Sequence, residues 1–204
     1  MARPDVSEER RSQIVASAVK VFARKGFANA RMDDVAAEAG LSKGLLYWYF
    51  ASKDELMTAI ADLLFGGELL KMQNLPGEGL SAHACLKKCL EIFSADLRSH
   101  LKLMPVMYEF YALAFRSRTV RRVMRHYLQS FVAILEPILQ KGMEQGEFAK
   151  GDTRQTALAM VSILQGTLLT WAHDPNMVQV EEQLSMSAAL IFKGLEDKSG
   201  SELD

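Results

Sequence analysis

The sequence is poor in the features that hold small secreted proteins together or anchor a chain in a membrane. Its 204 residues include two cysteines, and no apolar run is long enough to cross a bilayer. A charged and then apolar signal at the N-terminus is also missing. We therefore expect a cytoplasmic protein that needs no disulfide, makes no membrane contact and is long enough to bury a substantial core.

The sequence also lacks a large net excess of positive or negative charge. The formal net charge is -1 at pH 7, so a basic field over the whole molecule cannot be the basis of nucleic-acid binding. Such binding would have to come from local charge. The first 53 residues carry nine Lys or Arg against six Asp or Glu, an excess that is modest and proves little alone.

Residue sets that mark catalytic or metal sites are lacking. The chain has no Gly-rich phosphate loop, no Ser/His/Asp set and no paired carboxylates, and its four histidines are scattered. Cys85 and Cys89 share a helix face, but His83 falls on another, so the three do not converge on one ion. We expect no catalytic residue, no metal and no cofactor. Buried thiols are the favoured interpretation of the two cysteines, and a redox role stays open.

What the sequence does contain is helical periodicity, without β alternation or an internal repeat. Gly26 ends the first helix, Ser52 with Glu55 forms a capping box, and Asp152 caps a late helix. Pro105 is expected to open one helix and Pro137 to kink the next. The nine predicted helices lie at about 7–25, 33–39, 42–50, 52–74, 86–97, 105–115, 120–145, 152–173 and 184–195.

Two of these helices are short and adjacent. The helix over 33–39 ends at Gly40, whose missing Cβ suits a left-handed turn, and Ser42 can cap the helix that follows. Two short helices joined by a Gly turn form the helix-turn-helix arrangement, in which the second helix enters the major groove of DNA. The pattern therefore predicts a DNA-binding module near the N-terminus.

The second short helix ends in the aromatic run "YWYF". Tyr and Trp offer a flat apolar surface to a thymine methyl and a polar tip to a phosphate oxygen. The alternative is that all four aromatics are core residues, and we accept it for Phe50. Three adjacent residues span about 200 degrees of a helix. We therefore expect at least one of Tyr47, Trp48 and Tyr49 to face outward.

From Ser12 to Leu56 the sequence resembles the TetR family of bacterial transcriptional regulators. The run "VFARKGFANARMDDVAAEAGLSKGLLYWYFASKDEL" follows the family's Gly-aromatic turn, its "DDVA" helix, "AGLSKG", and "LYWYF" ahead of "SK". The later helices resemble the family more loosely, in helix order and in the "GEF" segment. The resemblance implies an all-helical homodimer that represses transcription until a small molecule binds the C-terminal domain.

The DNA-binding residues follow from the module and from this resemblance. Lys43 lies in the first turn of the second short helix and Lys53 lies past its end, so both are expected to contact phosphates. The family usually has hydroxyl residues at Ala30 and Leu45, and Arg31 could replace the first by reaching a phosphate. The expected DNA-binding set is Arg31, Ser42, Lys43, Gly44, Leu45, Tyr47, Trp48, Tyr49 and Lys53.

The helix over 152–173 carries two apolar stripes on nearly opposite sides. The stripe of small residues suits close helix approach across a subunit boundary, and one face of the last helix would join it. The alternative is a helix fully buried within one subunit. The expected dimer interface consists of Ala159, Ile163, Gly166, Thr170, Leu184, Ala188, Ile191 and Leu195.

The other stripe, together with methionines and aromatics of the middle helices, suits an apolar pocket with a few polar groups. Plain core is the alternative for each of these residues, and solvent exposure is the alternative for Gln165. The expected ligand pocket is lined by Phe65, Phe93, Met104, Met107, Tyr108, Tyr111, Met124, Tyr127, Phe131, Leu164, Gln165, Leu168 and Trp171.

The sequence thus predicts an all-α fold. It comprises an N-terminal three-helix helix-turn-helix module over 1–56, a larger C-terminal helical ligand-binding and dimerisation domain over 57–197, and a disordered tail over 198–204. We expect a ligand-responsive repressor that a small apolar or aromatic molecule releases from a palindromic operator. The expected partners are a double-stranded DNA operator, a small-molecule effector and a second copy of the chain. The alternative is a helical ligand-binding protein or protein-interaction adaptor with redundant or lost DNA binding.

Overall fold

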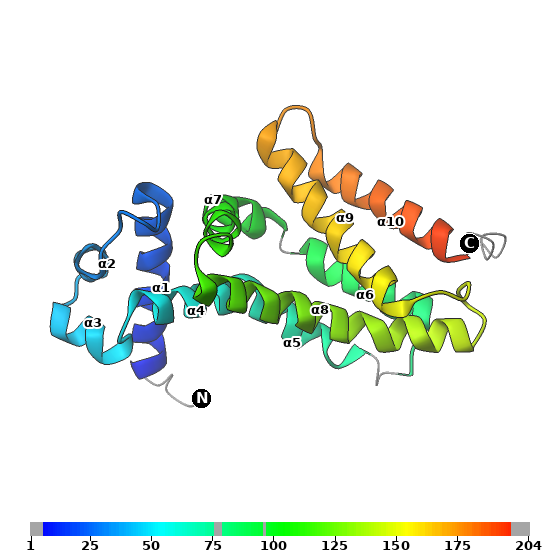
Figure 1. Ribbon diagram of the computed structural model, residues 1–204, viewed down its shortest axis with the longest axis horizontal. Coiled ribbons are helices and arrows are strands. Elements are labelled where there is room, and N and C mark those ends of the chain that lie inside the picture. Colours follow the sequence, from blue (N-terminus) through cyan, green and yellow to red (C-terminus); the bar gives the residue numbers. More distant parts are fainter. Residues whose placement is uncertain (1–5, 76–78, 96, 197–204) are drawn as a thin grey trace. The chain divides into compact units, whose positions relative to one another are not determined.

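The computed structural model describes residues 6–75, 79–95 and 97–196, and these residues form helices without any strand, as predicted. The predicted tail over 198–204 lies outside the described residues. The elements, labelled in Figure 1, are α1 (Val6–Lys25), α2 (Met32–Glu38), α3 (Lys43–Tyr49), α4 (Lys53–Ala61), the π-helical segment η1 (Asp62–Gly66), α5 (Gly67–Met72), α6 (Ala82–Ala95), α7 (Leu97–Ala114), α8 (Arg118–Glu144), α9 (Thr153–His173) and α10 (Val180–Glu196).

Contacts divide the chain into two compact units. The first comprises Met1–Gly66 with Lys102–Arg125, and the second comprises Gly67–Leu101 with His126–Asp204. The first unit therefore holds α1 to η1, most of α7 and the start of α8. One limit between the units falls between Gly66 and Gly67, directly after η1. The boundary after residue 56 that the sequence predicts is a functional division, and it stays a prediction.

The first unit contains the helix-turn-helix as the sequence predicts it. Gly40 ends α2 with φ of 65°, the left-handed conformation that glycine adopts without a steric penalty. The hydroxyl of Ser42 accepts the N–H of Leu45 at 3.2 Å and caps α3. Val35 and Leu46 have no exposed surface, so the two helices share a closed apolar contact.

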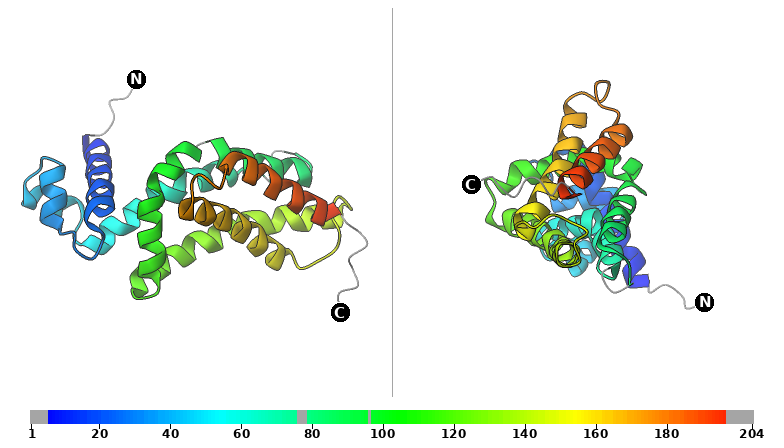
Figure 2. Two further views of the ribbon diagram at one scale, coloured as in Figure 1. Left: turned by 90° about the horizontal axis from the view of Figure 1, so that it is seen from above. Right: turned by 90° about the vertical axis from the view of Figure 1, so that its right-hand side faces the viewer.

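The second unit contains the α9–α10 pair, whose helices run side by side in Figures 1 and 2. Asp152 caps α9 by accepting the N–H of Gln155 at 2.9 Å, as predicted. The carboxylate of Glu147, in the turn after α8, accepts the N–H groups of Ala82 and His83, each at 3.0 Å. It thereby caps α6 from a distant part of the chain, and these bonds hold the pKa of Glu147 below its usual range.

Several helices differ in extent from the prediction. α7 begins at Leu97 and continues through Pro105, which was expected to open it. A proline inside a helix removes one hydrogen bond and crowds the preceding turn, and the apolar face of α7 outweighs that cost because Met104, Val106 and Phe110 are buried. α8 contains Pro137 within one helix, as predicted for the segment over 120–145, and a kink at that residue stays a prediction. The helix predicted over 52–74 is interrupted by η1, where one extra residue per turn shifts the side-chain register.

Candidate nucleic-acid interface

Helix α3 has one buried face and one exposed aromatic face. Leu46 and Phe50 have no exposed surface, whereas Tyr47 is 42% exposed and Trp48 is 72% exposed. The prediction that at least one aromatic points outward is confirmed. The rings of Trp48 and Tyr49 meet edge to face, with centroids 4.7 Å apart, so a neighbour orients the exposed indole. α3 therefore offers a flat aromatic surface on the side away from its own core.

The first turn of α3 is open. Ser42, Lys43, Gly44 and Leu45 are all exposed, and a Cβ added at Gly44 would meet nothing within 4 Å. The ammonium of Lys43 lies 2.9 Å from the carboxylate of Asp33 on α2. That hydrogen bond raises the pKa of Lys43. Both side chains are well exposed, and an exposed ion pair is weak, so a phosphate could displace the carboxylate.

Lys53 is placed differently from Lys43. Its ammonium donates to the carbonyl oxygens of Phe27 and Ala30, the latter at 2.7 Å, and it lies 4.1 Å from the centroid of the Phe27 ring. Burial lowers the pKa of Lys53. The side chain that the sequence predicts on a phosphate is thus bonded to the loop between α1 and α2, and its role on DNA stays a prediction.

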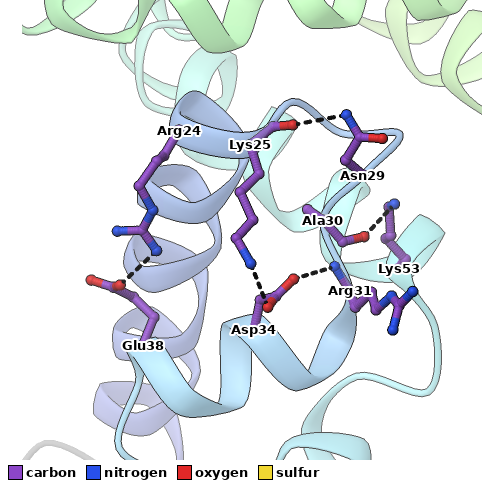
Figure 3. A network of polar contacts seen from close by, with 8 residues as sticks. All are labelled: Arg24, Lys25, Asn29, Ala30, Arg31, Asp34, Glu38 and Lys53. Carbon is purple, nitrogen blue, oxygen red and sulfur yellow. Dashed lines mark hydrogen bonds and ion pairs between the residues drawn. The ribbon is translucent and has the colours of Figure 1, made fainter.

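A network of charged side chains joins α1 to α2 (Figure 3). Arg24 lies 3.2 Å from Glu38, and Lys25 lies 2.6 Å from Asp34. Asp34 also accepts the backbone N–H of Arg31 at 2.9 Å, and the bonds from Lys25 and then from Arg31 lower the pKa of Asp34. The guanidinium of Arg31 forms none of these ion pairs and extends away from the network in Figure 3, consistent with its predicted access to a phosphate.

Sequence reasoning missed this network. The signal was present as basic residues at the end of α1 and acidic residues in α2. Spacing along the chain does not show which of these residues face one another, because that depends on the angle between the helices.

The predicted dimer residues fall into two sets. On α9, Ala159, Ile163 and Thr170 are exposed and Gly166 is partly exposed. On α10, Leu184, Ile191 and Leu195 are buried within the protomer and Ala188 is partly buried. α10 has a second apolar stripe that sequence reasoning did not select, on which Met186 is 57% and Leu190 is 62% exposed.

That second stripe borders an open groove of about 680 Å³ between α9 and α10. Ile163, Gly166 and Thr170 line it from α9, and Met186 and Leu190 line it from α10. Exposed apolar surface of this kind marks an interaction site more often than a free surface. Both stripes of α10 are apolar, so the sequence alone could not tell the face toward α9 from the face toward solvent.

The predicted pocket residues are distributed over both compact units. Phe65, Met104, Met107, Tyr108, Tyr111 and Met124 belong to the first unit, and Phe93, Tyr127, Phe131, Leu164, Gln165, Leu168 and Trp171 belong to the second. Met104, Met107, Tyr127 and Leu168 are buried, whereas Gln165 is exposed. Burial raises the pKa of Tyr111, so its hydroxyl stays a neutral hydrogen-bonding group. A ligand site formed by these residues stays a prediction.

The cysteines have the character of ordinary core residues. Cys85 and Cys89 are both buried and neither is in a disulfide, and burial raises the pKa of Cys89 to about 12. A thiol in that state is protonated at neutral pH and reacts slowly. No set of three His, Cys, Asp or Glu residues in the described part of the chain could hold a metal ion. Within the same part, every helix is too short or too polar to span a bilayer.

Both the N-terminal and the C-terminal part of the sequence match models of known protein families. Residues 14–60 match the model of bacterial regulatory proteins of the tetR family, and residues 82–194 match the C-terminal model of BetI-type transcriptional repressors. The HTH-type transcriptional regulator YfiR of Bacillus subtilis, itself uncharacterised, is 33% identical over 142 residues, which is 69% of this chain and 69% of that protein.

Solved structures with the same fold include two bound to small molecules. FadR from Bacillus subtilis in complex with stearoyl-CoA matches with a TM-score of 0.71 and 21% identity, covering 90% of this chain and 98% of that one. The complex of SmeT with triclosan matches with a TM-score of 0.79 and 15% identity, covering 93% of each chain. SmeT is the repressor of a multidrug efflux pump of Stenotrophomonas maltophilia. At these identities the likeness shows the fold alone.

Proposed function

Because the chain belongs to the TetR family of bacterial transcriptional regulators, we propose that it is a homodimeric repressor that leaves a palindromic operator when a small apolar or aromatic molecule binds. The outward aromatic face of α3 supports this proposal most directly. Its exposed indole and phenol lie beside Lys43 on a helix-turn-helix whose inner face is closed. The aromatic surface suits contact with thymine methyl groups, and the neighbouring cation suits contact with phosphates.

The proposed DNA contacts have distinct roles. Tyr47, Trp48 and Leu45 would meet base edges, whereas Lys43 and Arg31 would meet phosphates. The proposed set also includes Ser42, Gly44 and Tyr49 in and around the same helix, and Lys53 is considered below.

The proposed dimer explains why one short helix can be specific. A single recognition helix reads few bases, so two copies would read half-sites about one helical turn, roughly 34 to 36 Å, apart. The exposed apolar groove between α9 and α10 supports pairing through these helices. We propose Ile163 and Gly166 of α9 with Met186 and Leu190 of α10 as its centre.

An apolar effector is supported by the fold and by the residues of α7. Relatives of this fold have been solved with stearoyl-CoA, whose acyl chain is apolar although its coenzyme A portion is charged, and with the aromatic molecule triclosan. Met104 and Met107 are buried, and methionine adapts its shape to different ligands. To release most of the bound protein, an effector must favour the released state by several kcal/mol, roughly 5 at the extreme.

Selection of bound fragments from random double-stranded DNA tests the proposal. We expect a palindromic consensus, binding by a dimer, and loss of binding with stearoyl-CoA, triclosan or a hit from a library of apolar aromatics. Failure to enrich any sequence at low salt, while thermal shifts show a bound ligand, would instead support the adaptor alternative.

A further inference from the structure

The loop between α1 and α2 is held from two sides at Phe27. From α4, the ammonium of Lys53 bonds to the carbonyl oxygen of Phe27 and covers its ring. From α7, the carboxylate of Glu109 accepts the N–H of Phe27 at 3.4 Å. All three residues belong to the same compact unit. The N–H of Phe27 thus faces the anionic carboxylate of Glu109, and its carbonyl oxygen faces the cationic ammonium of Lys53.

The same loop carries the start of α2. Lys53 also bonds to the carbonyl oxygen of Ala30, the residue before Arg31, as Figure 3 shows. Ala30 is buried and α2 begins at Met32, so this bond fixes the backbone from which α2 starts. The ring of Phe27 packs edge to face on the buried Phe22 of α1, with centroids 5.2 Å apart. Movement of the loop would therefore move α2, and with it the contact between α2 and α3.

The setting of Lys53 differs from that of a phosphate-binding lysine. An ammonium has three N–H donors, and two of them are taken by carbonyls while the ring of Phe27 covers one side. Lys43 shows the contrast, because its side chain is 62% exposed and its partner is a single exposed carboxylate. To bind Lys53, a phosphate would have to displace the two carbonyl oxygens and the ring, which already take the place of water around the ammonium.

We propose that Lys53 and Glu109 are positioning residues for DNA binding: they clamp Phe27, fix the loop over residues 26–31 and so place Arg31 and α2 before DNA arrives. The proposal rests on the proposed function. Without the clamp, the loop would be ordered only on binding, and that ordering would weaken the affinity. Glu109 also places one end of the clamp on α7, the helix that carries the proposed effector contacts Met107 and Tyr111.

The salt dependence of operator binding distinguishes a positioning role from a phosphate contact. Each lost phosphate contact lowers the slope of log affinity against log salt by about 0.9, whereas a lost clamp leaves the slope unchanged. Lys53→Met keeps the stem over the ring and removes the charge. We expect it to weaken operator binding about tenfold with an unchanged slope. Lys53→Arg, which keeps the charge and several donors, should restore most of the affinity.

Lys43→Ala is the matched control, because it should lower the slope by about one. Glu109→Gln should weaken binding in the same manner as Lys53→Met. A slope that falls in Lys53→Met as it does in Lys43→Ala would overturn the proposal, and so would an unchanged affinity in Lys53→Met.

Hydrogen exchange of the Phe27 amide gives a second readout that needs no DNA. The amide should exchange at least severalfold faster in Glu109→Ala than in the wild-type protein, at equal thermal stability. Equal exchange rates would overturn the clamp. If the wild-type protein bound no DNA while this amide was protected, the proposed function would fail and the clamp itself would stand.

Discussion

At the scale of single residues, the neighbours of a charged side chain decide what it can do. Lys43 and Lys53 flank the same helix, yet one is paired with an exposed carboxylate and the other is bonded to backbone carbonyls. Burial lowers the pKa of Lys53, while the hydrogen bond that Lys43 donates to Asp33 raises the pKa of Lys43. The two lysines therefore differ in how easily a phosphate could reach them.

Asp33→Asn should strengthen operator binding. The change removes the carboxylate that competes with phosphate for Lys43 and would also repel the DNA backbone. An exposed ion pair is weak, so we expect a gain of only roughly two- to fivefold at low salt. Titration of labelled operator measures the gain, and Asp174→Asn, in the loop after α9 and outside the unit that holds α2 and α3, is the control. Unchanged or weaker binding would show that Lys43 does not leave Asp33 for DNA.

Trp48→Ala should weaken operator binding and alter base preference without destabilising the fold. The indole is 72% exposed, and loss of one specific base contact typically costs about 1 to 3 kcal/mol, equal to roughly five- to 150-fold in affinity. Phe115 lies in the turn between α7 and α8, and its ring is 84% exposed. Phe115→Ala therefore serves as the control. Equal loss of affinity in both variants would place the DNA surface elsewhere.

Sequence reasoning reached α3 correctly because the caps and the Gly turn are local signals. Ser42 and Gly40 act within a few residues of their own position, and the alternation of buried and exposed side chains follows from helical geometry. The orientation of the Lys53 side chain could not be predicted from such local signals. It depends on Phe27, which is distant in the sequence, and on how the loop folds over α4.

At the scale of elements, side chains from distant segments complete several helix ends. Glu147 caps α6, and Lys141 on α8 donates to the carbonyl oxygen of Leu80 at 2.8 Å just before α6 begins. The turn between α8 and α9 therefore supports the start of α6. This support is not visible in the sequence around Ala82, which offers only Ser81 as a local cap.

Glu147→Gln should lower the stability of the protein and remove part of its dependence on acid pH. The pKa of Glu147 is depressed in the folded state, so its contribution is fully present above the carboxyl's ordinary pKa and is lost as the pH falls through the folded pKa. The loss at pH 7 should be about 1 kcal/mol, typical of a helix cap.

Chemical denaturation at pH 7 and at pH 3 measures this effect. The difference between wild type and variant should shrink at the lower pH, and Glu144→Gln, on the exposed end of α8, is the control. A constant difference would assign the effect to packing.

Gly142→Ala should destabilise the second unit through overpacking. A Cβ at this position on α8 would lie 2.2 Å from the ring of Phe148 and 2.8 Å from the Cβ of Ala82. Relief requires backbone movement, at a cost of about 1 to 3 kcal/mol in the free energy of unfolding. In Gly194→Ala the new Cβ would meet nothing within 4 Å, so that helix should gain up to about 1 kcal/mol. Thermal unfolding of both variants gives the comparison.

Hydrophobic periodicity predicts where the helices lie but not always which face of a helix is buried. The pattern located α9 with its Asp152 cap and the part of α10 from Leu184 onward, and the two stripes of α9 separate into a buried and an exposed side. On α10 both stripes are apolar, and the choice between Ile191 and Leu190 as the outer residue depends on the angle at which α10 meets α9. A proline such as Pro105 was over-interpreted as a helix start, because burial of the surrounding residues outweighed its local cost.

At the scale of the whole molecule, the exposed groove of the α9–α10 pair makes dimerisation testable separately from folding. Ile163→Glu places a charge on a residue that is 40% exposed, so it should give a folded monomer with weak operator binding. Ile191→Glu buries a charge at a residue that is 8% exposed and should destabilise the protomer by about 3 kcal/mol or more. Sedimentation and circular dichroism distinguish the two. An intact dimer in Ile163→Glu would move the interface away from this groove.

Several cations of the helix-turn-helix module are bonded within the protein itself, and this affects how the regulator would find its operator. Arg24 and Lys25 face carboxylates and Lys53 faces carbonyls, so these three should add less to the counterions displaced from random DNA than Lys43, whose only printed partner is an exposed carboxylate. Weak counterion release means weak and short-lived encounters with the wrong sequence. We therefore expect little one-dimensional sliding along the chromosome. Search would proceed mainly by repeated collision through the cell volume, with the dwell time at each site set by base contacts.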